Sequence, residues 1–163
     1  MNLVIVQARM GSTRLPGKVL RKVCGKTLLE LQNERIQTVA EISRIVIATT
    51  VAADDNEIVQ VCTKNGIDYF RGSESDVLDR YYQTACKLGC KPEDTILRIT
   101  ADCPLIDPQV VISVLQLYHE ARADYASNTD PPTYPDGLDV EVFSFAVLAR
   151  TWQEANLPSE REH

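Results

Sequence analysis

Asn2–Gln7 reads N-L-V-I-V-Q, and residues 8–18 read A-R-M-G-S-T-R-L-P-G-K. The first run is short, apolar and rich in branched side chains, which predicts a buried strand. Gly11, Pro16 and Gly17 interrupt the second run, so it predicts a loop that leaves this strand.

Strand and helix patterns alternate after this loop. Helical spacing or capping signals predict helices over residues 27–39, 54–65, 75–88, 108–122 and 144–155. Short apolar runs predict strands over 44–49, 67–70, 95–99, 125–126 and 138–143. The alternation predicts an α/β fold, a three-layer αβα sandwich with a mostly parallel sheet. No linker or repeat divides the chain, so we expect a single domain over residues 1–163.

Composition excludes several classes of protein. The net charge of −6 disfavours a general nucleic-acid binder. The odd number of cysteines, five, argues against a complete disulfide framework. No apolar run approaches the ~20 residues that span a bilayer, and the N-terminus does not resemble a secretory signal. We therefore expect a cytoplasmic protein that does not interact with membranes.

The loop over residues 8–18 has the composition of an anion site. Its glycines let backbone amides approach an anion, Ser12 adds a hydroxyl, and Arg9, Arg14 and Lys18 add positive charge. Its glycine spacing fits neither the P-loop nor the dinucleotide-binding fingerprint. A basic surface turn with incidental glycines is the alternative explanation.

A second loop, over residues 101–107, follows the strand predicted at 95–99. Asp102 lies just beyond that strand, where its carboxylate can reach a crevice and hold Mg²⁺, although a turn-forming role is the alternative. Asp107 precedes Pro108 and is explained by helix capping. Arg98 either neutralises a phosphate or pairs with a nearby acid.

The pattern Arg-x-x-Ser-x-Arg-Leu-Pro-x-Lys, from Arg9 to Lys18, resembles the signature of the cytidylyltransferases that activate acidic sugars. Within that family, the chain looks most similar to the spore coat polysaccharide biosynthesis branch, over residues 7–20, 70–81, 98–108 and 134–145. The resemblance implies a nucleotide-diphospho-sugar transferase-like fold. It also implies transfer of CMP from CTP to a sugar, expected to be acidic, with release of pyrophosphate.

The resemblance also implies roles for individual residues. Lys18, Arg9 and Asp102 are the expected catalytic residues, with Asp102 as the ligand of Mg²⁺. Arg14 either contacts the nucleotide or braces the loop through a carboxylate. The nucleotide-binding residues expected from the first loop are Ala8, through its backbone, Arg9, Gly11, Ser12, Arg14 and Lys18.

Two further segments border the expected site. Arg71, Ser73 and Arg80 are expected to face the cytidine; the alternative is a capped helix in which Arg80 pairs with Asp76. The second segment, over residues 134–143, places Asp139 and Glu141 on one strand face, where they bind sugar hydroxyls or a second metal, or face solvent. The substrate-binding residues expected there are Tyr134, Asp136, Asp139 and Glu141.

Two rival functions remain open at this point. A glycosyltransferase shares the architecture but normally carries a D-x-D motif, which Asp102-Cys103-Pro104 does not supply. A non-catalytic nucleotide-binding module is the other. Proteins of the resembling family run further than residue 163, so we expect a C-terminally truncated nucleotidyltransferase domain, and by the same resemblance a homodimer.

Overall fold

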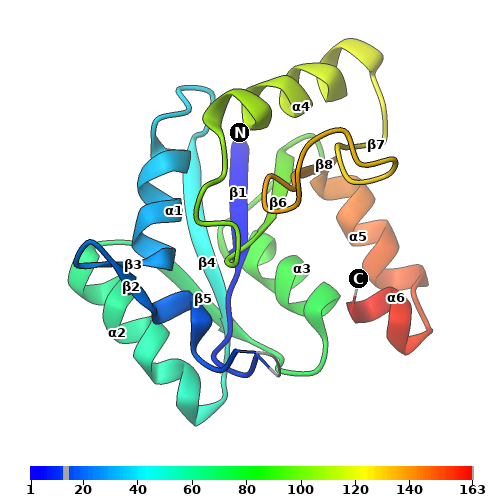
Figure 1. Cartoon of the computed structure of the whole chain (residues 1–163). Coiled ribbons are helices and arrows are strands. Elements are labelled where there is room, and N and C mark those ends of the chain that lie inside the picture. The colour runs from blue at the N-terminus through cyan, green and yellow to red at the C-terminus, as the bar shows by residue number, and fades with distance from the viewer. Residues whose placement is uncertain (13–14, 163) are drawn as a thin grey trace.

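The computed structural model describes residues 1–12 and 15–162 and contains a six-stranded sheet in the order β5-β4-β1-β6-β8-β7 (Figure 1). The strands are β1 (Asn2–Gln7), β4 (Arg44–Thr50), β5 (Asp68–Gly72), β6 (Thr95–Thr100), β7 (Tyr125–Ser127) and β8 (Glu141–Ser144). β5, β4, β1 and β6 pair in parallel, whereas β8 runs antiparallel to both β6 and β7. The sheet is therefore mixed but mostly parallel, as predicted.

Helices connect the strands. They are α1 (Leu28–Gln37), α2 (Asn56–Asn65), α3 (Val77–Lys87), α4 (Pro108–Ala121), α5 (Phe145–Glu154) and the short α6 (Pro158–Glu162). Two 3₁₀ turns, η1 (Lys18–Leu20) and η2 (Ala53–Asp55), and a small hairpin, β2 (Lys22–Val23) with β3 (Lys26–Thr27), complete the fold. The hairpin and α6 have no counterpart in the sequence predictions, and β8 begins three residues later than predicted.

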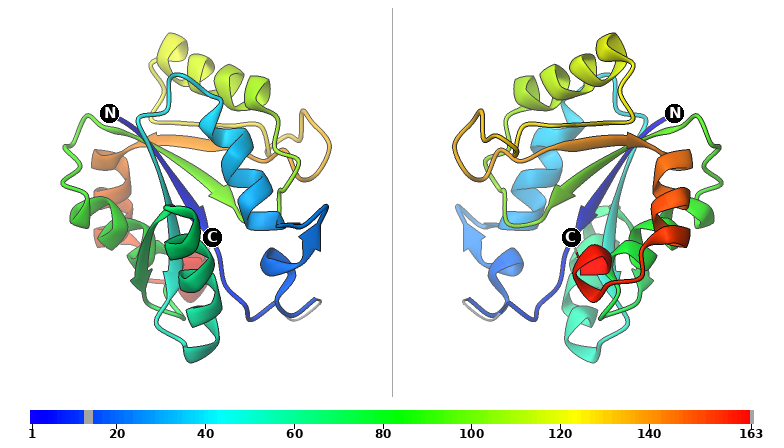
Figure 2. Two further views of the ribbon diagram at one scale, coloured as in Figure 1. Left: turned by 90° about the vertical axis from the view of Figure 1, so that its left-hand side faces the viewer. Right: turned by 90° about the vertical axis from the view of Figure 1, so that its right-hand side faces the viewer.

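Both faces of the sheet are covered by helices, which confirms the three-layer arrangement (Figure 2). Because side chains alternate along a strand, Val4 and Val6 of β1 join the core beneath α1, α2 and α4. Leu3 and Ile5 point the other way, into the core beneath α3 and α5. β1 lies between β4 and β6 and is buried on both faces, which explains its nearly continuous apolar run.

Two of the predicted capping residues are confirmed at helix starts. Thr27 accepts a hydrogen bond from the Glu30 amide, and the Glu30 carboxylate accepts one from the Thr27 amide, which confirms the predicted capping box. Asp107 caps α4 by accepting from the Gln109 amide at 2.8 Å. Over residues 1–12 and 15–162, every helix is too short or too polar to cross a bilayer.

Candidate active site

The two predicted loops meet at the carboxyl edge of the sheet because β1 and β6 are neighbours. The Ala101 amide donates to the Gln7 carbonyl at 3.0 Å, so the chain segments leaving the two strands run side by side. A cleft of about 470 Å³ opens between them. The predicted site residues that line it are Ala8, Arg9, Ser12, Lys18, Asp102, Asp136 and Asp139.

Lys18 and Asp102 contact one another across the cleft. The Lys18 Nζ lies 2.6 Å from Asp102 Oδ2, although the two residues are 84 positions apart. Partial burial opposes the charge on Asp102, but hydrogen bonds from Lys18 and Thr100 hold the pKa of its carboxyl below the ordinary value. The ionised form of Asp102 is thus favoured at the point where the two loops meet.

A tight turn shapes the first loop. The Ser12 and Gly17 amides both donate to the Met10 carbonyl, at 2.8 and 3.0 Å, which folds the loop back on itself. Gly17 has φ of 67°, a left-handed conformation that favours glycine, and an added Cβ would lie 3.2 Å from the Met10 methyl. Thr13 and Arg14 lie outside the described residues, so the predicted nucleotide contact of Arg14 stays a prediction.

Asp55 anchors this loop and was missed by the sequence analysis. Its side chain is 2 % exposed and accepts from the Met10 amide at 2.7 Å and from the Thr50 amide at 3.1 Å. The Thr50 hydroxyl donates to the same carboxylate. In sequence, Asp55 resembles any acidic residue at a helix start, so no local pattern distinguishes it from its exposed neighbour Asp54.

Arg71 braces the same region and is not among the residues that line the cleft. Its Nε, Nη1 and Nη2 donate to the Thr50 carbonyl, the Asn56 side chain and the Ala52 carbonyl, at 2.8, 2.7 and 2.8 Å. These contacts use three of the five N–H donors of the guanidinium, and the predicted contact of Arg71 with a nucleotide stays a prediction.

Arg80 is buried at the start of α3. Its Nη1 donates to the Ser73 carbonyl at 2.8 Å, while Nε and Nη2 have no hydrogen-bond partner within the part of the chain that the structure describes. Burial lowers the pKa of this guanidinium, and the nearby charge of Arg9 lowers it further. The predicted pairing of Arg80 with Asp76 is not seen, since Asp76 instead caps α3 and pairs with Arg161. The Ser73 hydroxyl accepts from the Asp76 amide, and Asp76 rather than Ser73 is the residue that caps α3.

The acidic residues of the 134–143 segment lie in two different places. Asp136 and Asp139 line the cleft, and burial, with the charges of Asp136, Asp102 and Glu141, raises the pKa of Asp139. Tyr134 is 43 % exposed and lies outside the cleft lining. Glu141 was predicted to share the substrate site with Asp139 but is directed elsewhere.

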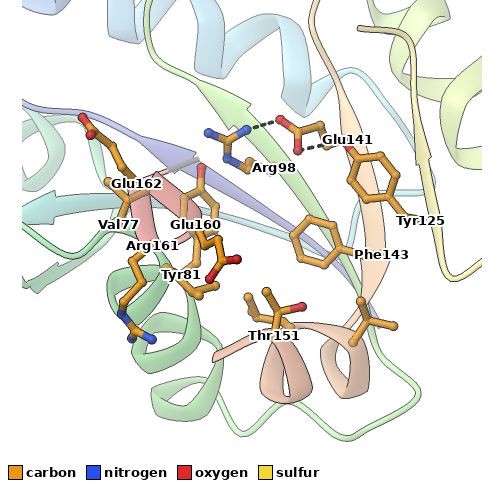
Figure 3. A pocket seen from close by; sticks show the side chains of 13 residues that line it. Val77, Tyr81, Arg98, Tyr125, Glu141, Phe143, Thr151, Glu160, Arg161 and Glu162 are labelled. Carbon is orange, nitrogen blue, oxygen red and sulfur yellow. Dashed lines mark hydrogen bonds and ion pairs between the residues drawn. The ribbon is translucent and has the colours of Figure 1, made fainter. Parts of the chain in front are cut away.

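Glu141 lies in a second, largely apolar cavity between α3, β8 and α5 (Figure 3). Arg98, its register partner on β6, forms an ion pair with it, and the Tyr125 hydroxyl donates to its other oxygen at 3.0 Å. This settles the open alternative for Arg98 in favour of an acid partner. The antiparallel register of β8 explains the difference, because it turns Glu141 onto the α3 face of the sheet.

Comparisons with known proteins agree with this geometry. A family model described as cytidylyltransferase matches residues 3–160. The spore coat polysaccharide biosynthesis protein SpsF of Bacillus subtilis is 38 % identical over 134 residues, which cover 80 % of this chain and 55 % of that protein. A 3-deoxy-manno-octulosonate cytidylyltransferase of Acidovorax sp. (strain JS42) is 31 % identical over 169 residues, covering 98 % of this chain and 62 % of the relative.

A solved structure supports the same grouping. A cytidylyltransferase from Leptospira borgpetersenii superimposes with a TM-score of 0.91 at 35 % identity, covering 99 % of this chain and 68 % of that one. The chain therefore spans between about half and two thirds of the length of these proteins.

Proposed function

The chain belongs to the cytidylyltransferase family, and from that premise we propose that it transfers CMP from CTP to a sugar for surface polysaccharide synthesis, with release of pyrophosphate. The observation that carries the proposal is the meeting of Lys18 and Asp102 in a cleft that Arg9 and Ser12 also line. Cations and hydroxyls bind phosphate oxygens, and a carboxylate beside them binds the cation that accompanies a triphosphate.

The donor set of the cleft fits Mg²⁺. Asp102 already has a cationic group, the Lys18 ammonium, at its carboxylate, which shows that its oxygens are accessible to a cation. Mg²⁺ takes one or two carboxylates and fills its remaining positions with water and phosphate oxygens, so one carboxylate beside the phosphate loop would be enough to hold it. Bound at Asp102, it would neutralise phosphate charge and polarise the α-phosphate.

In the proposed reaction, a sugar hydroxyl attacks the α-phosphorus of CTP. The hydroxyl gives its proton to solvent as one phosphorus–oxygen bond forms to the sugar, and the bond from the α-phosphorus to the oxygen that bridges to the β-phosphate breaks, so that pyrophosphate leaves. Lys18 and Arg9 stabilise the negative charge on the phosphates, and Ser12 donates to them. The cleft holds the two reactants in one geometry, so the protein contributes through orientation and charge and needs no covalent intermediate.

The remaining contacts in the proposal follow from placement. Ala8 lies buried beside the cleft and contacts the base through its backbone, with Gly11 in the turn behind it. Arg80 has two guanidinium nitrogens without a partner among the described residues, and in this proposal they supply donors to the nucleotide. Asp136 and Asp139 accept hydrogen bonds from sugar hydroxyls. A homodimer completes the proposal, and light scattering of the purified protein tests it.

Pyrophosphate release tests the activity. The protein is incubated with CTP, Mg²⁺ and a panel of acidic and neutral sugars, in parallel with UTP, ATP and GTP. We expect pyrophosphate only with CTP and one class of sugar, and a loss of at least about 100-fold in the Lys18→Ala variant. Consumption of a preformed nucleotide-sugar without pyrophosphate would instead indicate a glycosyltransferase. Tight CTP binding without turnover, in a protein of the relatives' full length, would indicate a binding module.

A further inference from the structure

The Lys18 ammonium forms an ion pair with the Asp102 carboxylate. The two groups are 2.6 Å apart, and their side chains are 27 % and 42 % exposed, so the contact lies within reach of solvent and of ligands. In the proposed function Lys18 binds the triphosphate and Asp102 binds the metal. Each group is therefore already held by the other.

The Lys18 side chain can leave this contact without moving the loop. Its backbone amide donates to the Leu15 carbonyl at 3.2 Å, and its carbonyl accepts from the Arg21 amide at 3.1 Å. The backbone is thus fixed on both sides, while the ammonium is carried by a flexible four-carbon stem. The movement needed is a change of side-chain rotamer.

The contact also has an electrostatic consequence. A divalent cation arriving at Asp102 must displace an ammonium that repels it at close range. Conversely, a phosphate that binds alone must draw the Lys18 ammonium away from Asp102. The Asp102 carboxylate would then lie near the phosphate with no cation to neutralise it. When metal and phosphate arrive together, the carboxylate and the ammonium each exchange one opposite charge for another.

We infer that Lys18 is a placeholder for the metal at Asp102, so that the metal and the triphosphate bind cooperatively and each binds weakly alone. Such coupling is reciprocal: the factor by which the nucleotide tightens metal binding equals the factor by which the metal tightens nucleotide binding. The inference rests on the proposed function, which places the metal at Asp102 and the triphosphate at Lys18.

The first experiment measures the binding of Mn²⁺ in the absence of nucleotide, and the concentration of free Mn²⁺ is determined from its electron paramagnetic resonance signal. Lys18→Met removes the ammonium, and Arg9→Met is the matched control, because it removes an equal charge from the same cleft. We expect Lys18→Met to bind Mn²⁺ about five- to tenfold more tightly than the wild type, and Arg9→Met to change affinity less than about twofold. Asp102→Asn should abolish the site. Equal tightening in the two methionine variants, or none in either, would overturn the placeholder role.

The second experiment measures nucleotide binding after the carboxylate of the ion pair is removed, and it does not depend on the folding of Lys18→Met. Metal-free CTP, kept so with EDTA, is titrated into Asp102→Asn and into Asp136→Asn, which removes another carboxylate from the cleft. We expect Asp102→Asn to bind metal-free CTP several-fold more tightly than Asp136→Asn does. In excess Mg²⁺ we expect the opposite order of affinities, with Asp102→Asn binding CTP more weakly than Asp136→Asn. Tightening that is equal in both variants would contradict the inference.

The two experiments also separate the inference from the proposed function. If no protein binds CTP under any condition, the proposed function fails, while the Mn²⁺ titration still decides the role of Lys18. If CTP binds with Mg²⁺ but Lys18→Met behaves like Arg9→Met, the proposed function stands and the placeholder role fails.

Discussion

The Asp55 carboxylate accepts a hydrogen bond from the Met10 backbone amide at 2.7 Å, which ties the loop that follows β1 to the end of β4. The same carboxylate binds the Thr50 amide and hydroxyl, so one buried side chain joins two neighbouring strand ends. The shape of the cleft thus depends on a residue outside it.

Replacing Asp55 with alanine should loosen this connection. The amides of Met10 and Thr50 would lose their acceptor in a buried setting, so we expect the free energy of unfolding to fall by about 2–4 kcal/mol. Nucleotide affinity should fall as well, because Met10 shapes the phosphate loop. Urea unfolding measures the first effect and calorimetric titration with CTP the second. Asp54→Ala, at the exposed neighbouring carboxylate, is the control, and a loss as large there would contradict the assignment.

Arg71 should act on stability more than on chemistry. Lysine cannot reproduce three directed contacts, so Arg71→Lys should lower the free energy of unfolding by about 1–3 kcal/mol. Arg44→Lys on the adjacent β4 is the matched control, because the Arg44–Asp68 pair is exposed and should contribute less than about 1 kcal/mol. Equal effects in the two variants, measured by urea unfolding, would show that the brace is unimportant.

The turn at Gly17 gives a test of the loop geometry. Gly17→Ala places a side chain in a left-handed conformation and against Met10, and should cost about 1–2 kcal/mol of stability. Gly11→Ala is the comparison, since an added Cβ there meets nothing within 4 Å and its φ is not positive. Thermal unfolding of the two variants should differ clearly; similar melting temperatures would mean that the turn has another shape.

The capping box of α1 should produce an acid-dependent change in stability. Hydrogen bonds from the Thr27 hydroxyl and the Thr27 amide lower the pKa of Glu30 in the folded protein. A lowered pKa means that the folded state holds fewer protons than the unfolded state. The stabilisation is therefore present above the ordinary glutamate pKa and is lost as the pH falls through the folded value.

Glu30→Gln, which keeps the shape of the side chain but does not titrate, should lose less stability than the wild type between about pH 5 and pH 3. Urea midpoints at several pH values measure the difference. Thr27→Ala should cost about 1 kcal/mol at neutral pH. Parallel acid profiles for the wild type and Glu30→Gln would show that this carboxylate does not contribute.

Local patterns in the sequence predicted the elements well, because most helices here begin or end at strong signals. Thr27 with Glu30, Asp107 with Pro108, and Gly66 after α2 all mark boundaries through their own backbone preferences. Lys18 and Asp102 were also predicted to share a site, since both follow strands of a mostly parallel sheet and such ends gather at one edge.

The interactions that the sequence did not reveal depend on contacts between distant segments. Glu141 alternates with Val140 and Val142 as a substrate-facing residue would, but the register of β8 against β6 pairs it with Arg98. Arg71 was expected to face the cytidine, and its position near the end of β5 directs its side chain to the carbonyls of Thr50 and Ala52. Neither register nor strand order is encoded in local spacing.

The affinity for CTP in excess Mg²⁺, measured by calorimetry for the wild type, Lys18→Ala and Lys26→Ala, tests most directly whether Lys18 binds the triphosphate. Lys26 is a lysine of the nearby β3, but it pairs with Glu34 and is not among the residues that line the cleft. We expect Lys18→Ala to weaken CTP binding by about 10- to 100-fold and Lys26→Ala to leave it nearly unchanged. Equal affinities for CTP in the wild type and Lys18→Ala would show that Lys18 does not bind the triphosphate.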